Sequence, residues 1–364
     1  MTHNIKRLLF VGDTMLGRLV DASLPVHNPV SKEEEEHAKR MKKHTNGNPY
    51  ASIWGNTLPI FHNADVRFIN LECCITTHDV PYPNKIFNFR THPSNVRVLN
   101  EAKIDFANLA NNHILDYNYP GMVETIKTLD DNNIKCAGAG DNLLEAGIPA
   151  VVDVGGLKIA VIGAADHMSY FRATDSKYGI NYVDIIGEMG VNSIYNISNF
   201  IERTKTEIQQ LRNKEKIDLV VLSIHLGPNF LFEVPDNHQT FVKQLIDKVD
   251  INIIHGHSSH HVKAIEIYKG SVIMYGCGDY ISDYQVSEEY RNDLSFIYEL
   301  LYDTSNKQFI RCELTPTVIS NLQTNVASSN GKEWLFGKMI HLCDEIGTET
   351  IISEDNSHLI IPIN

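Results

Sequence analysis

The sequence predicts an α/β fold with buried, partly parallel sheets, and two observations support this prediction. Short apolar runs typical of strands alternate with segments typical of helices along most of the 364 residues. Several of these apolar runs are followed at once by a short polar segment rich in carboxylate, amide or imidazole groups. Because ligands in such folds bind outside the carboxyl ends of the strands, an enzyme is the first hypothesis.

The strands and helices are predicted from the spacing of apolar residues and from helix-start signals. Strands are predicted at residues 5–12, 64–70, 105–110, 158–164, 218–225, 251–256 and 271–276. Helices are predicted at residues 93–102, 119–133 and about 194–214. This alternation is typical of βαβ units, in which parallel strands end at the same edge of a sheet.

No linker rich in Pro, Gly or Ser divides the chain, so residues 1–315 are predicted to form one domain. Residues 28–52 contain the charged run KEEEEHAKRMKK and are predicted to be an insertion with a solvated helix. Residues 316–364 have mixed polarity and are predicted to form a helical extension that packs on the same domain.

Composition and charge exclude several classes of function. The formal net charge is −13 and no basic stripe is interleaved with aromatic residues, so nucleic acid is not expected as a partner. The first apolar run is too short for a signal peptide, and no apolar stretch reaches the length of a membrane helix. A cytoplasmic location is therefore expected. The six cysteines have no CxxC spacing and are expected to be reduced, buried thiols.

Two carboxylates follow the first two predicted strands. Asp13 comes directly after LLFVG and is predicted to lie in a Gly-Asp turn, for which a purely structural role is the alternative. Glu72 comes two residues after Asn70, so both side chains share a strand face if the extended conformation continues. A carboxylate at this place is expected to be partly buried and to need a cation or hydrogen-bond donors.

The segment ANLANNHILD after the third strand is more specific. Asn112 offers an amide oxygen to a cation, and His113 offers an imidazole that can donate a proton. Asp116 follows three residues later and is placed to orient the ring of His113. The alternative is a turn capped by asparagine side chains, with an incidental histidine.

The segment HGHSSHHV has four histidines within seven residues. Imidazole is a common ligand of zinc-like and manganese-like ions, so His257 and His260 are the strongest metal candidates. His225 ends a neighbouring strand and is a candidate for one more ligand. His255 lies inside the apolar run, where a core position is the alternative, and His261 can point away from the site.

Several charged residues are candidates for substrate binding. Asp279 and Asp283 lie in YGCGDYISDY after the last predicted strand, where a buried turn is the alternative. Arg18 and Arg90 are the cations predicted to hold an anionic substrate through paired hydrogen bonds.

Taken in order, the segments GDTMLGR, NLE, NLANNHILDY, HLGPNF, GHSSHH and YKGSVIMYGCGDYISD resemble those of the CapA family over about residues 5–300. This family comprises poly-γ-glutamate capsule-synthesis proteins and is similar to the calcineurin-like metallophosphoesterases. The resemblance implies a four-layer α/β/β/α sandwich whose site lies at the strand ends, between two sheets.

The resemblance also implies roles for single residues. Glu72 matches a bridging Asp of the phosphoesterases, and His113 matches the histidine that donates a proton or stabilises charge beside the metals. The matches to metal-ligand positions are Asp13, Asn112, His225, His257 and His260.

Two departures reduce this ligand set. Met15 stands where phosphoesterases have the histidine of Asp-x-His, and Ser258 stands where members of the capsule family often have histidine. We therefore expect one or two divalent ions (Mn, Fe or Zn), or none.

Three functions are compatible with these residues. The first is a metal-dependent hydrolase of a phosphoester or of a γ-glutamyl or peptide amide, in which His113 protonates the leaving group. The second is a metal-free enzyme in which His113, His257 and Glu72 move protons on a peptide or amino-acid substrate. The third is a poly-γ-glutamate binding protein, which the acidic charge of the chain disfavours. The expected partner is a small or peptide-like anionic substrate.

Overall fold

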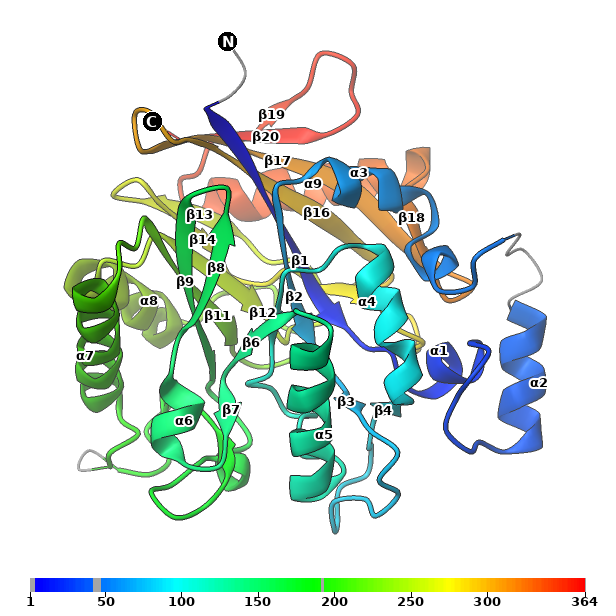
Figure 1. Cartoon of the computed structure of the whole chain (residues 1–364). Helices are drawn as coiled ribbons and strands as arrows, with labels where there is room; N and C mark the ends of the chain where they lie inside the picture. The colour runs from blue at the N-terminus through cyan, green and yellow to red at the C-terminus, as the bar shows by residue number, and fades with distance from the viewer. Residues whose placement is uncertain (1–3, 42–46, 191–192, 364) are drawn as a thin grey trace.

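The computed structural model describes residues 4–41, 47–190 and 193–363 of the chain. Within these residues, two β-sheets pack face to face, and helices cover the outer face of each sheet (Figure 1). The layers follow the order helix, sheet, sheet, helix. The predicted α/β/β/α sandwich is therefore confirmed.

The first sheet has ten strands among the described residues. In sheet order they are β19 (Ile351–Ile352), β20 (Leu359–Pro362), β17 (Gln308–Ser320), β16 (Leu294–Asp303), β1 (Ile5–Thr14), β2 (Val66–Leu71), β5 (Phe106–Asn108) and β6 (Lys135–Ala137), with β15 (Asp279–Ile281) beside β1 and β18 (Gln323–Val326) beside β17. The strands from β1 to β6 in this order run parallel, whereas β16, β17, β20 and β19 pair antiparallel.

The second sheet has six strands among the described residues, and its central strands are parallel. In sheet order they are β13 (Ile265–Tyr268), β14 (Ser271–Met274), β12 (Ile253–His257), β11 (Leu219–His225), β9 (Leu157–Ala165) and β8 (Ala150–Val154). Two short pairs lie outside the sheets: β3 (Cys74–Ile75) with β4 (Arg90–Thr91), and β7 (Ala139–Gly140) with β10 (Gly179–Ile180).

The inward side chains of both sheets form one apolar layer. Phe10 and Phe68 of the first sheet stack with ring centroids 4.5 Å apart. They share a buried cluster with Val161, Val221 and Ile253 of the second sheet. The central strands are apolar on both faces because each sheet is covered on both sides.

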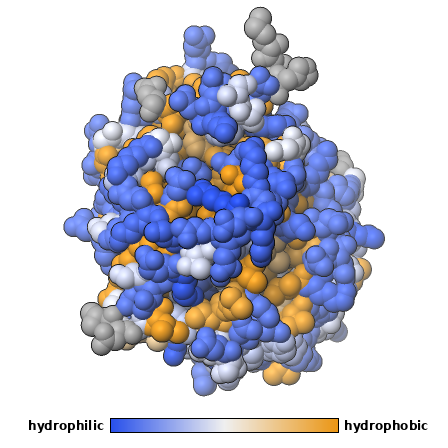
Figure 2. All heavy atoms as spheres, turned by 60° about the vertical axis from the view of Figure 1, so that its left-hand side comes forward, coloured by the Kyte–Doolittle hydropathy of each residue, from blue (hydrophilic) through white to orange (hydrophobic). Residues whose placement is uncertain are grey.

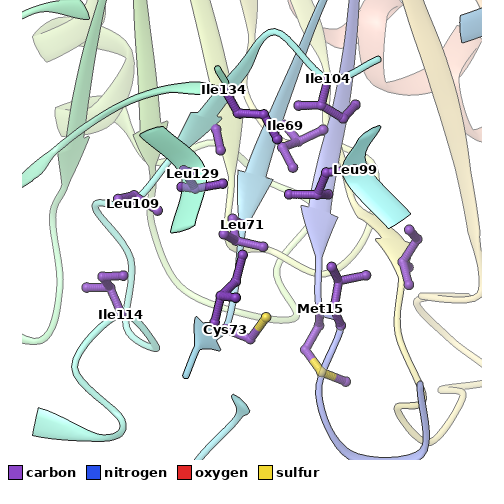
Figure 3. Close-up of a cluster of buried hydrophobic side chains, with 14 of the residues drawn as sticks. Met15, Ile69, Leu71, Cys73, Leu99, Ile104, Leu109, Ile114, Leu129 and Ile134 are labelled. Atoms are coloured by element: carbon purple, nitrogen blue, oxygen red, sulfur yellow. The ribbon is translucent and has the colours of Figure 1, made fainter. Parts of the chain in front are cut away.

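Helices lie around the two sheets. They are α1 (Arg18–Ala22), α2 (Lys32–Met41), α3 (Leu58–Asn63), α4 (Arg97–Glu101), α5 (Asn118–Asp131), α6 (Leu143–Gly147), α7 (Ile197–Lys214), α8 (Asp236–Val249) and α9 (Ser329–Glu345), with short 3-10 turns η2 (Ala51–Thr57), η3 (Pro93–Val96) and η4 (Ser169–Phe171). On the first sheet, Leu99 of α4 and Leu129 of α5 pack with Ile69 and Leu71 of β2 (Figure 3).

On the second sheet, α7 and α8 form the outer layer. Phe200 of α7 and Phe241 of α8 meet edge to face at 5.8 Å and pack with Leu222 of β11. Asn196 caps α7, because its side chain accepts a hydrogen bond from the N–H of Asn199.

All seven predicted strands are confirmed, as β1, β2, β5, β9, β11, β12 and β14, and the predicted helices are confirmed as η3 with α4, α5 and α7. The predicted Gly-Asp turn at Asp13 is wrong, because β1 continues to Thr14. The strand extends this far because the N–H groups of Asp13 and Met15 donate to the carbonyls of Gly278 and Ile281, around β15.

The C-terminal part contains more than the predicted helix. β17 runs through position 316 to Ser320, and after α9 the chain returns to the first sheet as β19 and β20. α9 contributes Leu335 and Met339 to the cluster between the sheets. In the predicted insertion at 28–52, α2 is largely exposed, and residues 42–46 lie outside the described residues.

The cysteines and the surface agree with a globular chain. All six cysteines are free, and five of them are buried. The face shown in Figure 2 is mostly hydrophilic, with smaller hydrophobic areas between the polar groups. In the part of the chain that the structure describes, no helix is both long enough and apolar enough to cross a membrane.

Candidate metal centre

Acidic and imidazole side chains converge where the parallel strands of both sheets end. These six residues, which we call the ligand cluster, include all but one of the predicted metal ligands and one residue predicted to bind substrate. They are Asp13 on β1, Glu72 after β2, His225 at the end of β11, His257 at the end of β12, His260 in the following loop and Asp279 at the start of β15.

A bulge in β1 turns Asp13 toward the second sheet. Phe10 pairs with Phe68 of β2, but the next pair is Asp13 with Asn70, so three steps along β1 match two along β2. The extra residue reverses the alternation of side chains, so Asp13 faces the same side as Phe10. The sequence pattern does not show this reversal.

Gly12 makes the bulge possible. A Cβ at this position would lie 1.8 Å from the carbonyl oxygen of Gly278, so another residue does not fit. The close approach lets the N–H of Asp13 donate to that same carbonyl at 2.9 Å.

Asp13, His225 and His257 form the first of two groups of potential ligands. The Nδ1 atoms of the two histidines are 2.9 Å apart, and each is 3.9 Å from Oδ1 of Asp13. Asn70 donates to Oδ1 of Asp13 at 2.7 Å and fixes the carboxylate. One ligand atom of each residue lies within 4.8 Å of the others, so one ion can contact all three.

The second group consists of Asp13, Glu72, His260 and Asp279. Nδ1 of His260 is 2.8 Å from Oδ1 of Asp279 and 3.7 Å from Oδ2 of Asp13. The hydroxyl of Tyr284 donates to Oε2 of Glu72 at 3.3 Å. Asp13 belongs to both groups, so its carboxylate is common to the two sets of potential ligands.

The carboxylates of the cluster are buried in an environment in which a bound cation would stabilise their negative charge. Oε1 of Glu72 and Oδ2 of Asp279 are buried and have no hydrogen-bond partner among the described residues. Burial, and then repulsion from Asp13, raises the pKa of Glu72 well above its usual value. Burial also raises the pKa of Asp13 to about 7, despite the nearby His260. Buried anions are costly unless they are paired or bind a metal, so this donor set fits a divalent cation.

The same carboxylates also change the pKa of His260, and they favour its protonated form. Burial alone would lower the pKa of His260, but Asp279, Glu72 and Asp13 raise it to about 10. A proton on His260 therefore balances part of the negative charge when no cation is bound. A metal ion competes with this proton for the same ring nitrogen.

A chain of hydrogen bonds fixes the ring of His257. Nε2 of His255 donates to the carbonyl of Val11 at 2.9 Å, and Oγ of Ser223 is 3.0 Å from Nδ1 of His255 and 3.2 Å from Nε2 of His257. Since His255 is buried without a carboxylate partner, it is neutral, and its Nδ1 accepts the hydroxyl proton of Ser223. Ser223 then accepts from Nε2 of His257, which leaves Nδ1 of His257 free to face Asp13.

His113 lies beside the cluster with the partner that the sequence predicted. Its Nδ1 is 2.6 Å from Oδ2 of Asp116, and Nζ of Lys85 is 2.5 Å from Oδ1 of the same carboxylate. The ring of Phe89 stacks on His113 at 4.1 Å. Burial lowers the pKa of His113 to about 4, although Asp116 acts in the opposite direction.

The two asparagines before His113 differ in their contacts. Oδ1 of Asn111 accepts from the N–H groups of His113 and Ile114, which is the capping arrangement considered as an alternative. Oδ1 of Asn112 is buried and has no hydrogen-bond partner among the described residues. Asn112 lines a cavity together with His113 and His260.

The residues predicted to bind substrate lie in three different places. Arg18 lines the same cavity, and its Nε is 3.4 Å from Oδ2 of Asp283. Asp279 belongs to the ligand cluster. Arg90 does not line the cavity: its guanidinium donates to backbone carbonyls and lies 4.7 Å over the ring of Tyr117.

Comparison with known proteins identifies the family. The family described as bacterial capsule synthesis protein PGA_cap matches residues 7–284. The chain belongs to this family. Its resemblance to CapA proteins is thus confirmed. A probable polyglutamine synthesis accessory protein of Mycobacterium tuberculosis is 30% identical over 99% of this chain and 97% of its own length. The PGA biosynthesis protein CapA of Bacillus subtilis is 27% identical over 75% of this chain and 62% of its own length.

Two solved structures are among those to which this PGA_cap protein is similar. The calcineurin-like phosphoesterase YfkN from Bacillus subtilis has a TM-score of 0.46 and 13% identity, covering 93% of this chain and 98% of its own. A hypothetical protein from Thermus thermophilus has a TM-score of 0.45 and 13% identity, covering 86% of this chain and 99% of its own.

Several polar residues near the cluster of this PGA_cap chain were not predicted from the sequence. Asp166 and His167 directly follow β9, which is the same signal that identified the other candidates. Asp166 accepts hydrogen bonds from His167 and His238, both at 2.7 Å, and the ring of His167 lies 4.8 Å from that of His225. Burial would raise the pKa of Asp166, but these hydrogen bonds lower it. Lys85 gives no comparable signal, because it lies in a loop away from any strand end.

Proposed function

We propose that this protein is a metal-dependent hydrolase. The observation that carries the proposal is that one buried carboxylate, Asp13, belongs to two groups of potential ligands at the carboxyl ends of the strands. When bound, a Mn, Fe or Zn ion polarises a phosphoryl or carbonyl oxygen and lowers the pKa of its water. The residues proposed to hold one or two ions are Asp13, Glu72, Asn112, His225, His257, His260 and Asp279.

His113 is the proposed proton donor to the leaving group. Asp116 engages Nδ1, and Lys85 and Phe89 hold Asp116 and the ring in place, so Nε2 is the nitrogen that acts on the substrate. Burial lowers the pKa of His113 to about 4, which favours the neutral ring. An anionic group nearby favours the imidazolium form, from which Nε2 donates the proton.

The proposed substrate is a small anion, either a phosphoester or a γ-glutamyl or peptide amide. Arg18 is the one Arg or Lys that lines the cavity, among the residues that the structure describes. Its side chain is 42% exposed, so it can hold one anionic group of a substrate. The names of the relatives link them to polyglutamine and PGA synthesis, which favours a γ-glutamyl amide as the first compound to test.

A metal-free acid–base enzyme is the second candidate. The arrangement of His113, Asp116 and Lys85 favours it, because these three side chains hold one another without an ion. Hydrolysis that continues at full rate in excess chelator would support this candidate. A protein that only binds poly-γ-glutamate would need several cations along a groove, and the single Arg18 in the cavity argues against that role.

Elemental analysis of the purified protein tests the proposal. After incubation with Mn, Fe or Zn, we expect near-stoichiometric metal in the wild type and none in the double variant His257→Ala/His260→Ala. His341→Ala is the matched control, because this histidine of α9 has a side chain that is 64% exposed and lies outside the cluster. If neither the wild type nor the control retains any of these metals, the metallohydrolase is excluded.

A further inference from the structure

A cavity of 410 Å³ opens beside the ligand cluster. His113 and His260 line it, so any substrate at the cluster also occupies this space. Small-molecule sites usually measure roughly 300–1,000 Å³, and one phosphate group fills only a small part of such a volume. The cavity therefore has room for the remainder of the substrate. Its other walls include four aromatic side chains: Phe87, Phe89, Phe230 and Tyr284.

One wall is a series of nearly parallel rings. Phe89 stacks on His113 with centroids 4.1 Å apart and planes 23° apart. Phe87 lies against Phe89 at 6.4 Å and 30°. Phe87 itself is 61% exposed, so its ring remains largely in contact with water. The series leads from the proposed proton donor to an uncovered aromatic face.

Phe230 provides a second exposed ring, and its backbone conformation is strained. Its φ of 57° lies in the left-handed region, which a bulky residue rarely adopts. The side chain is 43% exposed, while its ring meets Tyr290 at 5.3 Å and His260 at 6.0 Å. Backbone strain of this kind clusters at active sites, ligand clamps and switch regions. Strain and exposure together favour a role in binding rather than in folding.

The polar groups of the cavity restrict which other groups a bound ring can carry. Arg18 supplies one positive charge and is already paired with Asp283. Asn229 and Gln285 also line the cavity and can exchange hydrogen bonds with the edge of a polar ring. This combination of flat apolar faces, amide groups and a single cation differs from what a chain of carboxylates requires.

We propose that this cavity binds a planar aromatic or heteroaromatic group of the substrate, which lies against Phe230 and Phe87 while the anionic group lies at the ligand cluster. This inference rests on the proposed function for the position of the anion. It narrows the substrate to a phosphoester or amide that carries a ring. Poly-γ-glutamate, which has no ring, does not meet this requirement.

Binding of two non-hydrolysable probes tests the inference without any turnover. Phenylphosphonate and methylphosphonate carry the same anionic group, but only phenylphosphonate has a ring. Ligand-observed NMR titration measures the affinity of each probe for protein that has been incubated with Zn and contains no Mn. We expect phenylphosphonate to bind wild type about tenfold more tightly than methylphosphonate, since a ring stacked on aromatic faces gains this much. Phe87→Ala and Phe230→Asn should abolish the difference in affinity between the two probes.

The stability of Phe230→Asn and a matched control variant distinguish loss of the ring site from misfolding. Asn tolerates a positive φ, so Phe230→Asn should unfold at the temperature of wild type or above it. Ile86→Ala is the matched control, because Ile86 is 88% exposed in the same loop but does not line the cavity. Equal affinity of wild type for both probes, binding of neither, or an equal loss in Ile86→Ala would overturn the inference.

The outcomes also separate this inference from the proposed function. A preference for phenylphosphonate in a protein that hydrolyses neither phosphoesters nor γ-glutamyl amides would keep the ring site and reject the hydrolase. Hydrolysis with equal kcat/KM for phenyl and methyl phosphate would keep the hydrolase and reject the ring site.

Discussion

At the residue scale, the orientation of His257 depends on a hydroxyl group outside the ligand cluster. Ser223 lies between the rings of His255 and His257, at 3.0 Å and 3.2 Å. It thereby determines which nitrogen of His257 carries the proton. A residue behind a ligand typically changes metal affinity by about 10–100-fold, so we expect Ser223 to position His257 for a bound ion.

Ser223→Ala tests this role. Without the hydroxyl, His257 can protonate Nδ1 instead of Nε2, and we expect the dissociation constant for Zn²⁺ to rise about 10–100-fold by calorimetric titration. Ser271→Ala is the control, because this buried hydroxyl donates to the carbonyl of Ile251 on another part of the second sheet. An equal change in both variants would show a general loss of stability rather than a role at the metal centre.

Lys263 is a buried cation whose effect on stability depends on pH. The residue is 2% exposed, and its Nζ donates to the carbonyl of Glu233 at 3.3 Å. Burial lowers its pKa from 10.5 to about 8. Between these two values the unfolded chain binds more protons than the folded protein, so the free energy of unfolding rises with pH across this window. Below pH 8 the folded state bears the full cost of the buried charge.

Lys263→Met removes this cost. We expect the free energy of unfolding at pH 7 to increase by roughly 1–3 kcal/mol, and the difference from wild type to shrink as pH rises from 8 to 10.5. Urea unfolding at several pH values measures both effects, with the exposed Lys248→Met as the control. A variant that is less stable than wild type at pH 7 would refute this account.

At the element scale, the bulge in β1 both places Asp13 and joins β1 to β15. Gly12→Ala puts a methyl group 1.8 Å from the carbonyl oxygen of Gly278, so the two strands must separate. We expect a loss of roughly 1–3 kcal/mol in the free energy of unfolding, together with loss of bound metal. Gly337→Ala in α9, where a Cβ meets nothing within 4 Å, should be neutral or stabilising. Unchanged metal content in Gly12→Ala would contradict the importance of the bulge.

The same strand shows how far the sequence predicts the elements. The buried parallel strands are continuous apolar runs, and such runs are visible without knowledge of the fold. The bulge is not visible, because one extra residue changes the facing of Asp13 without changing the apolar run before it. β18 and β19 were missed for another reason: they are short strands at the side of the sheet with exposed residues such as Ile351 and Ile352.

The residues of the candidate site also divide into those that the sequence predicts and those that it does not. Asp13, Glu72, His225 and His257 were found because each lies at the end of a predicted strand, which is a local property of the sequence. Asp166 and His167 carry that signal too and were overlooked. Lys85 and Ser223 could not be found in this way, because their importance comes from tertiary contacts with Asp116 and His257.

At the scale of the whole molecule, the ligand cluster connects the two sheets. Asp13, Glu72 and Asp279 come from the first sheet or the residue after its strands, whereas His225 and His257 come from the second. An ion that binds groups from both sides links the sheets and stabilises only the folded state. At a free metal concentration of 100 times the dissociation constant, this linkage adds about 2.7 kcal/mol to the free energy of unfolding.

Amide hydrogen exchange measures which strands a bound ion stabilises. On addition of Zn²⁺ to chelator-treated protein, we expect slower exchange at the carboxyl ends of both β2 and β11, because the ion holds residues on each side. The hairpin of β19 and β20 lies at the far edge of the first sheet and should change little if the linkage is local. The double variant His225→Ala/His257→Ala removes the ligands of the second sheet and should lose protection in β2 as well as in β11. Protection confined to the second sheet would mean that an ion binds the histidines alone and does not join the two layers.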